Sequence, residues 1–518
     1  MSGGTFSAHR RSILAWTLAP LLLAVIHGLA FRFVVDDAYI SLRYAANLVA
    51  GHGLVFNPGE PVEGYSNLLW VLLLAGGLEL GVEPLLWARL LGVFFTGMML
   101  VLLPGCVRRL APDHTNRTPW SGRAAQLLTA ATGAVGCWML AGLETPLFTF
   151  LAVLAWHSAL KRRPLPAGLA GLLMVLTRPE GPALAGIFLA WSLLPGAGLR
   201  PAVSPLRRPL TWVGPAMLVL GTAAYFLWRH ATYGWWLPNT YYAKTGDLAG
   251  QLRTGLPYTL SFLRVYGPAL IVLVVAGIVR GEVPSRGRRD FLLSAGVILL
   301  WSSYVTVIGG DMLGMFRFFV PILPILIALS VAVATSTGWF SGPRSALTVA
   351  VIFGLALLPG SIWGKERRLV TAHMSEANLG GWFLAGDALA ELLPDGATIA
   401  LGPAGYIPWK TGAVCYDFYG LVDPEIAHMD VVFTHGYAGH EKTDGALVLL
   451  RRPDYILIGN VDITGAPRTG LIPPLDRELD IVRHEAFQRN YEQVWIPVAG
   501  GKVLNLFQRK GLARPLVP

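Results

Sequence analysis

Long apolar stretches separated by short polar segments run through the first two thirds of the chain. A transmembrane helix needs about 20 mainly apolar residues. The pattern therefore predicts a polytopic α-helical membrane protein with about eleven transmembrane helices. The expected spans lie near residues 13–33, 85–104, 124–142, 145–160, 165–177, 181–195, 210–228, 266–279, 291–308, 316–336 and 345–362.

The first apolar stretch follows His9, Arg10 and Arg11 and is similar to a signal peptide. It is longer than the apolar part of such a peptide, about 7 to 15 residues, and further spans follow it. We interpret it as an uncleaved first helix.

Basic residues between the spans predict the orientation, because Lys and Arg are enriched in cytoplasmic loops. With the N-terminus inside, the short apolar stretch 68–80 must lie at the outer interface, since a crossing there would put Arg108 and Arg109 outside. The remaining spans then alternate without conflict and leave the C-terminus outside. The inner loops hold basic runs at residues 108–109, 161–163, 200–208, 280–289 and 344.

After residue 363 the apolar runs become too short to cross a bilayer. Residues 397–401, 413–416, 455–458 and 503–507 are typical of strands, and residues 377–393 and 441–450 of helices. This alternation predicts a small α/β domain. The predicted organisation is therefore a membrane domain over 1–363, with a first outer loop at 34–84, and an extracytoplasmic α/β domain over 364–518.

The composition agrees with a membrane protein and excludes several other classes. Hydrophobic residues make up 54% of the chain and charged residues only 14%, whereas soluble domains carry about 25% charged residues. The net charge of +10 comes from basic residues spread over loops, whereas a nucleic-acid-binding protein gathers them on one face. The three cysteines define no disulfide framework.

The predicted topology places most polar motifs on the outer side. Asp36 and Asp37 directly follow the first span, and adjacent carboxylates repel unless a proton or a cation neutralises one of them. The pair suits a general base whose neighbour positions an acceptor or binds a divalent cation, with Mg²⁺, Mn²⁺ and Ca²⁺ as the options. The alternative is a polar helix end. Residues 38–50 after the pair predict an amphipathic interfacial helix.

Three cations are candidates for contact with a lipid phosphate. Lys244 ends an aromatic segment, 235–244, that is typical either of a sugar-stacking loop or of an interfacial aromatic belt. Arg178 and Arg317 stand at outer helix ends where positive residues are rare, although an arginine there can also extend to the headgroups. A phosphate is the expected partner of all three.

Several of these segments resemble a known family. Asp36-Asp37-Ala38-Tyr39-Ile40, the stretch 51–60 and the stretch 62–65 are similar to the first outer loop of bacterial lipid-phosphosugar glycosyltransferases of the GT-C superfamily. Within that superfamily the similarity is to the terminal β-(1→2)-arabinofuranosyltransferases of the mycobacterial cell wall. Later blocks at 142–145, 177–181, 238–244 and 310–318 resemble the same group, and the similarity becomes thin beyond Asp423.

The resemblance implies a transferase in the bacterial cytoplasmic (inner) membrane. Its donor is a sugar, arabinofuranose by the family pattern, on a polyprenyl phosphate carried in the lipid bilayer, and its acceptor is an envelope glycan or glycolipid at the outer face. By the family pattern Asp36 or Asp37 is the expected base, with Glu63 and Glu144 as lesser candidates, and Arg178, Lys244 and Arg317 are expected to bind the donor phosphate. The further expected substrate contacts are Arg43, Asn57, Glu63, Tyr65, Glu144, Glu180, Asn239, Tyr241, Tyr242 and Asp311, and the expected acceptor contacts are Tyr416, Asp417, Asp423 and His440.

Two other classes stay open from the sequence. A transporter or flippase of lipid-linked saccharides fits the number of spans, but transporters typically show paired repeats with broken helices and charges near the membrane midplane. A non-catalytic envelope assembly protein would leave the acidic pair dispensable.

Overall fold

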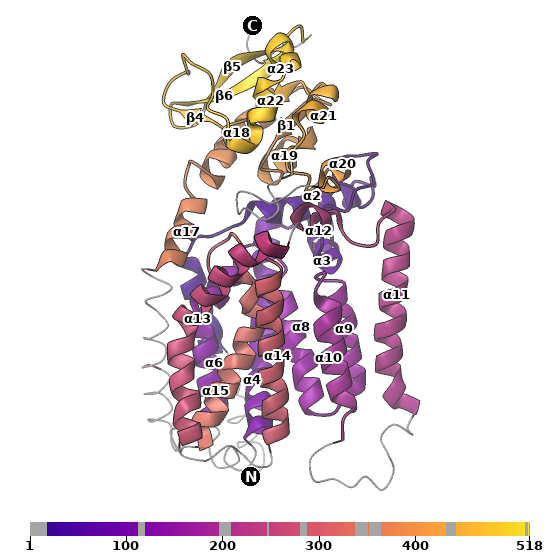
Figure 1. The fold of residues 1–518 in the computed structure, drawn as a ribbon, viewed down its shortest axis with the longest axis vertical. Coiled ribbons are helices and arrows are strands. Elements are labelled where there is room, and N and C mark those ends of the chain that lie inside the picture. The colour runs from indigo at the N-terminus through magenta and orange to yellow at the C-terminus, as the bar shows by residue number, and fades with distance from the viewer. Residues whose placement is uncertain are drawn as a thin grey trace. The chain divides into compact units, whose positions relative to one another are not determined.

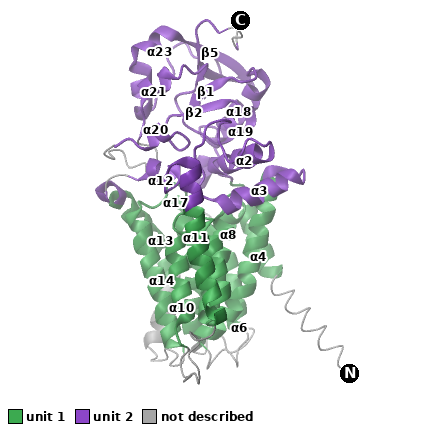
Figure 2. Ribbon diagram, turned by 90° about the vertical axis from the view of Figure 1, so that its right-hand side faces the viewer, with its two compact units in different colours: residues 1–33, 85–226, 252–368 green, residues 34–84, 227–251, 369–518 purple. Residues whose placement is uncertain are grey.

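The structure is a computed structural model, and it describes residues 18–111, 120–195, 209–245, 248–279, 287–336, 351, 364–430, 442–512 and 516. The chain divides into two compact units, coloured separately in Figure 2. Unit 1 comprises residues 1–33, 85–226 and 252–368, and unit 2 comprises residues 34–84, 227–251 and 369–518. The predicted first outer loop, 34–84, thus belongs to the same unit as the C-terminal region.

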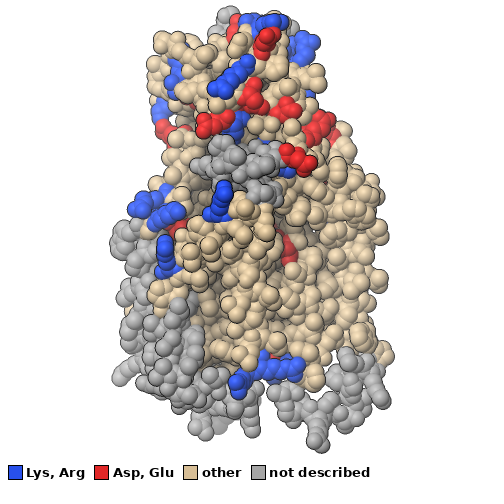
Figure 3. Space-filling view, in the orientation of Figure 1, with Lys and Arg blue, Asp and Glu red and all other residues tan. Residues whose placement is uncertain are grey.

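Unit 1 is built from apolar helices that run side by side in Figure 1. On the face shown in Figure 3 these helices present a broad band with few charged side chains. The helices that contribute to unit 1 are residues 18–29, α4 (Pro84–Leu110), α6 (Trp120–Ala131), α7 (Gly133–Met139), α8 (Thr145–Leu160), α9 (Pro164–Val175), α10 (Gly181–Leu193), α11 (Val213–Tyr233), α13 (Leu248–Val279), α14 (Arg288–Val307), α15 (Leu323–Ser336) and α17 (Lys365–His373), with the 3₁₀ helices η2 (Pro209–Trp212) and η3 (Arg317–Ile322).

Four helical stretches among the described residues are long and apolar enough to cross a membrane: Pro84–Leu110, Pro209–Tyr233, Arg288–Val307 and Arg317–Thr335. The predicted span 124–142 is not one continuous helix, because extended backbone at Thr132 separates α6 from α7. The predicted span 266–279 forms the second half of the longer helix α13. The predicted span 345–362 lies almost entirely outside the described residues, so the total of about eleven stays a prediction.

Small residues let helices of unit 1 approach closely. A Cβ atom on Gly168 in α9 would lie 2.1 Å from the carbonyl oxygen of Gly214 in α11, and one on Gly214 would lie 2.1 Å from that of Pro164. Membrane helices associate through such contacts, because lipid provides no hydrophobic force to drive them together.

Unit 2 contains a six-stranded mixed sheet. In the order β2-β1-β3-β6-β4, strand β1 is parallel to β2 and β3, whereas β6 is antiparallel to β3, β4 and β5. Buried side chains such as Phe418, Ile456 and Phe507 form its core. The strands are β1 (Thr398–Leu401), β2 (Val414–Asp417), β3 (Tyr455–Ile456), β4 (Ile463–Thr464), β5 (Tyr491–Val498) and β6 (Lys502–Arg509).

The four predicted strands correspond to β1, β2, β3 and β6, while β4 and β5 were missed. Strand β5 pairs along its whole length with β6, and several of its side chains are exposed, so its apolar signal is weak. The helices of this region are α18 (Leu379–Leu392), α19 (Tyr406–Thr411), α20 (Pro424–Ala427), α21 (Gly445–Leu450), α22 (Leu479–Arg483) and α23 (Glu485–Asn490), with the 3₁₀ helix η4 (Asp476–Glu478).

Three helices from the two inserted segments complete unit 2. Helix α2 (Asp36–Val49) forms where a helix is predicted at 38–50, but Asp36 and every residue from Ala38 to Ala45 are buried, so burial is not confined to one face. Helix α3 (Leu68–Glu79) forms at the stretch expected to lie at the interface, and α12 (Asn239–Lys244) forms in the aromatic segment.

Candidate active site

Asp36 is the first residue of α2, and its carboxylate is held by the backbone of a distant segment. The N–H of Gly405 donates to Oδ2 at 2.9 Å, and the N–H of Tyr406 donates to Oδ1 at 2.8 Å. The side chain is buried, and this burial raises the pKa of Asp36 to about 7, although the two N–H donors favour the charged form. Asp36 thus connects α2 to the start of α19.

Asp37 is the next residue along α2 and is less buried than Asp36. Successive residues point about 100° apart around a helix, so the two carboxylates do not share one environment. Asp37 also lies in the first turn, where the helix dipole favours a negative charge. Of the two, Asp37 is therefore the better placed to meet a substrate.

The described residues around the acidic pair do not form a cluster of ligands for a divalent cation. Both oxygens of Asp36 already accept backbone N–H groups. Within the described part of the chain, no three His, Cys, Asp or Glu side chains gather as metal ligands. The cation expected on the acidic pair stays a prediction, and we route no step of the proposed reaction through it.

Arg43 lies two turns after Asp36 in α2, and its guanidinium donates to four acceptors of unit 2. Its Nε donates to the carbonyl of Phe56 at 2.7 Å, and its Nη2 donates to Asn57 Oδ1 at 3.1 Å and to the carbonyl of Ala413 at 2.7 Å. Nη1 donates to the carbonyl of Pro408. The side chain is buried, so these contacts make Arg43 a structural residue that joins α2 to the segments it contacts.

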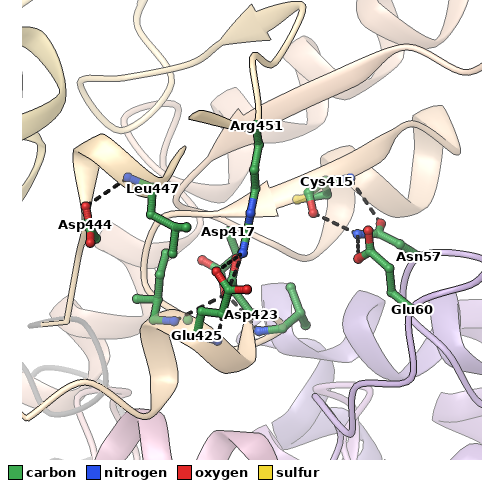
Figure 4. A network of polar contacts seen from close by, with 12 residues as sticks. Asn57, Glu60, Cys415, Asp417, Asp423, Glu425, Asp444, Leu447 and Arg451 are labelled. Carbon is green, nitrogen blue, oxygen red and sulfur yellow. Dashed lines mark hydrogen bonds and ion pairs between the residues drawn. The ribbon is translucent and has the colours of Figure 1, made fainter. Parts of the chain in front are cut away.

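Asn57 pairs with an edge strand of the sheet. Its Oδ1 accepts from the N–H of Cys415 at 3.0 Å, and its Nδ2 donates to the carbonyl of Cys415 and to Glu60 Oε2, each at 2.9 Å (Figure 4). The amide therefore pairs with β2 much as a neighbouring strand would.

Glu63 and Tyr65 are buried against the segment 227–251. The Glu63 carboxylate forms an ion pair with Arg229 at 2.7 Å. The hydroxyl groups of Tyr65 and Tyr233 are 3.1 Å apart, and the Tyr233 hydroxyl donates to the carbonyl of Leu54 at 2.9 Å. The two residues expected to contact substrate here thus bind side chains of the segment 227–251.

Asn239 fixes the first turn of α12. Its Nδ2 donates to the carbonyls of Gly420 at 2.7 Å and Leu421 at 3.1 Å, and its N–H donates to the carbonyl of Glu63 at 2.9 Å. Lys244 ends the helix half-buried, and no hydrogen bond or ion pair joins its ammonium to another described residue.

The two tyrosines of α12 differ in exposure. Tyr241 is exposed, whereas the ring of Tyr242 lies 4.2 Å from that of His428 and 5.6 Å from that of Trp235. The His428 and Trp235 rings stack at 3.8 Å. These aromatic faces are compatible with the sugar-stacking interpretation of the segment.

Arg178, one of the two arginines expected to bind the donor phosphate in unit 1, already contacts two carboxylates. Its Nη1 lies 2.9 Å from Glu144, and its Nε donates to Glu180. Glu144 precedes α8, and Glu180 precedes α10, so the ends of two helices supply the partners.

Arg317 forms an ion pair with Asp311, whose carboxylate lies 2.7 Å from its Nε. The ring of Phe318 lies 5.0 Å from the guanidinium carbon of Arg178 and 5.2 Å from that of Arg317. The fold thus brings both arginines to one aromatic ring, each beside acidic groups that offset its charge.

Asp417 and Asp423, two of the expected acceptor residues, bind their own domain (Figure 4). Asp417 accepts from the N–H groups of Tyr419 at 2.8 Å and Val422 at 3.1 Å, and burial raises its pKa to about 7. Asp423 caps α20 and forms an ion pair with Arg451.

Tyr416 is half-buried, with the guanidinium carbon of Arg451 at 5.5 Å from its ring. The fourth expected acceptor residue, His440, lies outside the described residues.

The partners of these residues were missed by sequence analysis. Gly405 and Tyr406 hold Asp36 through backbone atoms, which leave no mark on residue type. Arg229 and Phe318 had a detectable signal: the first is a charge near a span end, and the second is an aromatic residue next to Arg317.

Comparison with known proteins first gives the class. The fold is similar to that of ArnT from Cupriavidus metallidurans, which was solved with undecaprenyl phosphate. The similarity covers 97% of this chain and 99% of the ArnT chain, at a TM-score of 0.55 and 12% sequence identity. The likeness therefore concerns the fold, a set of apolar helices followed by a small C-terminal sheet.

Sequence relatives then give particular proteins. The chain is 31% identical over 275 residues to the terminal β-(1→2)-arabinofuranosyltransferase of Mycobacterium tuberculosis, covering 50% of this chain and 42% of that protein. It is 27% identical over 364 residues to the protein of the same name from Corynebacterium glutamicum, covering 59% and 48%. The expected resemblance is confirmed. The matched regions span less than half the length of these curated relatives.

Residues 372–509 match a protein-family model described as "Domain of unknown function (DUF8728)". This match covers β1 to β6 and the helices between them, so it corresponds to the sheet region of unit 2 alone.

Proposed function

We propose that this protein is a membrane glycosyltransferase that moves a sugar, arabinofuranose by its relatives, from a polyprenyl-phosphate donor to an envelope glycan or glycolipid. The reaction takes place at the outer face of the bacterial cytoplasmic membrane, with the N-terminus inside and the C-terminal domain outside. The similarity to two curated arabinofuranosyltransferases carries this proposal, and the ArnT-like fold supports it. A saccharide transporter is less favoured, because neither the relatives nor the fold belong to that class.

In the proposed reaction, an acceptor hydroxyl attacks the anomeric carbon of the donor sugar. The bond between that carbon and the phosphate oxygen breaks, and polyprenyl phosphate leaves with the bonding electrons. Asp37 takes the proton of the attacking hydroxyl as general base. The less buried position of Asp37, beside the anchored Asp36, supports this assignment.

The leaving phosphate gains charge, so it needs cations more than it needs a proton donor. We propose Lys244 and Arg317 as its main partners. Lys244 makes no ion pair with another described residue, and Arg317 is balanced by Asp311. Arg178 already faces Glu144 and Glu180, so its proposed role is to balance these carboxylates near Phe318.

The test is release of polyprenyl phosphate from polyprenyl-phospho-arabinofuranose by the purified full-length protein in bilayers, with and without an arabinan acceptor. We expect acceptor-dependent release by the natural protein and a loss of at least about 100-fold in Asp37→Asn, because general-base catalysis contributes about 10²–10⁴. Asp395→Asn, which changes an exposed carboxylate of unit 2, serves as the matched control. Movement of the intact donor across the bilayer without cleavage would indicate a transporter, and full activity in Asp37→Asn would refute the assignment of the base.

A further inference from the structure

One face of α2 is attached to the segment 405–413 at three successive places. Asp36, Tyr39 and Arg43 stand at positions i, i+3 and i+7, which project on the same side of a helix. All three contact that segment, and all three are buried. The contacts lie within unit 2, although the two segments are far apart in the sequence.

The contact at Asp36 is closely fitted. A Cβ atom on Gly405 would lie 2.2 Å from the backbone oxygen of Asp36 and 2.5 Å from its Oδ2. Real Cβ atoms do not approach other atoms so closely, so a residue with a side chain at 405 must displace Asp36. Glycine at this position permits the two N–H donations of Gly405 and Tyr406 to the carboxylate.

The other two contacts fix the direction of α2. The Tyr39 ring lies 4.9 Å from that of Tyr406, edge-on, and 5.2 Å from that of Trp409. Arg43 donates to the carbonyls of Pro408 and Ala413. Attachment at three places over its first two turns leaves α2 little freedom to rotate or slide against α19.

We infer that the segment 405–413 is the positioning element for the acidic pair, and that Asp36 is a positioning residue that orients Asp37. The inference rests on the proposed function, since Asp37 is the base there. It gives the C-terminal domain a part in turnover beside its expected part in holding the acceptor. A base that is misplaced by about 1 Å can lose about 100-fold in rate, so the fit at Gly405 matters for catalysis as well as for stability.

The first test is Gly405→Ala in the full-length protein, with Gly470→Ala as matched control, because a Cβ on Gly470 meets no atom within 4 Å. We expect Gly405→Ala to lower kcat by about 10- to 100-fold and to leave the KM for the lipid donor within about twofold of the natural value. Gly470→Ala should behave as the natural protein. Equal kcat values for the two variants would overturn the inference.

The second test separates a positioning residue from the base by the pH profile of kcat/KM. Asp36→Asn should keep the acidic limb of the profile, because Asp37 still titrates, but the plateau of kcat/KM should be lower. Asp37→Asn should lose the limb together with the activity. The double variant Asp36→Asn/Gly405→Ala should be no slower than the slower single variant, since both changes break the same contact.

The outcomes distinguish the two proposals. If Asp36→Asn lost the acidic limb and Asp37→Asn kept it, Asp36 would be the base. That result would overturn the inference and leave the proposed transferase function standing. A natural protein that releases no polyprenyl phosphate would overturn the proposed function and the inference with it.

Discussion

The carboxylate of Glu63 lies 2.7 Å from Nε of Arg229, and the two side chains are 2% and 3% exposed. The family resemblance implies a substrate contact for Glu63. In the structure this residue is one half of a buried ion pair that joins the first outer loop to the segment 227–251 inside unit 2. Replacing Glu63 is therefore expected first of all to change the stability of the protein, before any effect on substrate binding.

We expect Glu63→Met alone to lower the free energy of unfolding by about 3–5 kcal/mol, because it leaves the Arg229 guanidinium buried without its partner. The double variant Glu63→Met/Arg229→Met should recover most of this loss, since well-packed apolar residues often replace a buried ion pair without penalty. Denaturant unfolding in detergent measures both. A single variant as stable as the natural protein would contradict the prediction.

Arg317→Ala should raise the apparent KM for the lipid donor, because a cation near the donor phosphate is removed. The structure offers a matched control in Arg162, which also forms an ion pair with one aspartate, Asp290, at 2.7 Å. Arg162→Ala should leave the donor KM unchanged. Steady-state kinetics over a range of donor concentrations compares the two, and identical KM values would show that Arg317 serves only the fold.

Asn57→Ala should destabilise unit 2 by about 1–3 kcal/mol, because it leaves the N–H and carbonyl of Cys415 without their partner. Asn57→Asp retains an acceptor but loses the donor, so an intermediate loss is expected. Asn490→Ala, at an exposed position, is the control. Thermal unfolding followed by intrinsic fluorescence measures the series. A midpoint that stays constant across all three variants would show that the amide adds nothing to strand β2.

The buried carboxyl of Asp417 predicts a dependence of stability on pH. Burial raises its pKa from 3.8 to about 7, so the folded state binds the proton more tightly than the unfolded state does. The resulting stabilisation is complete below the unfolded pKa and is lost as the pH rises through about 7. Asp417→Asn, which stays neutral, should therefore lose less stability than the natural protein between about pH 5 and about pH 8. Unfolding midpoints at several pH values test this, and parallel curves would contradict it.

Much of the fold could be predicted from the sequence, because helices and strands depend on the local pattern of apolar residues. Apolar length located most helices of unit 1, and apolar runs located β1, β2, β3 and β6. The misses have local causes too. Thr132 breaks a stretch that is apolar enough for one helix, and β5 carries too many exposed side chains to stand out.

The candidate site could be predicted from the sequence only in part. Charge placement selected the pair Asp36 and Asp37 together with three cations as unusual residues for a membrane protein, namely Arg178, Lys244 and Arg317, and this selection needed no knowledge of their neighbours. Charge placement treated Asp36 as substrate-facing, and the family resemblance implied the same for Arg43. Both are occupied by backbone groups of the segment 405–413, and a backbone partner cannot be recognised from residue types.

Hydrophobic length and charge act locally, so the sequence alone predicts a helical membrane protein with an α/β region and a set of rare polar residues. The tertiary structure alone decided which of those residues bind one another. Asp36 meets Gly405 across a separation of 369 positions, and such a pairing depends on how distant segments pack. Packing also gives the two members of the acidic pair different surroundings: Asp36 is anchored and Asp37 is more exposed. Two adjacent aspartates in a sequence cannot be distinguished in this way.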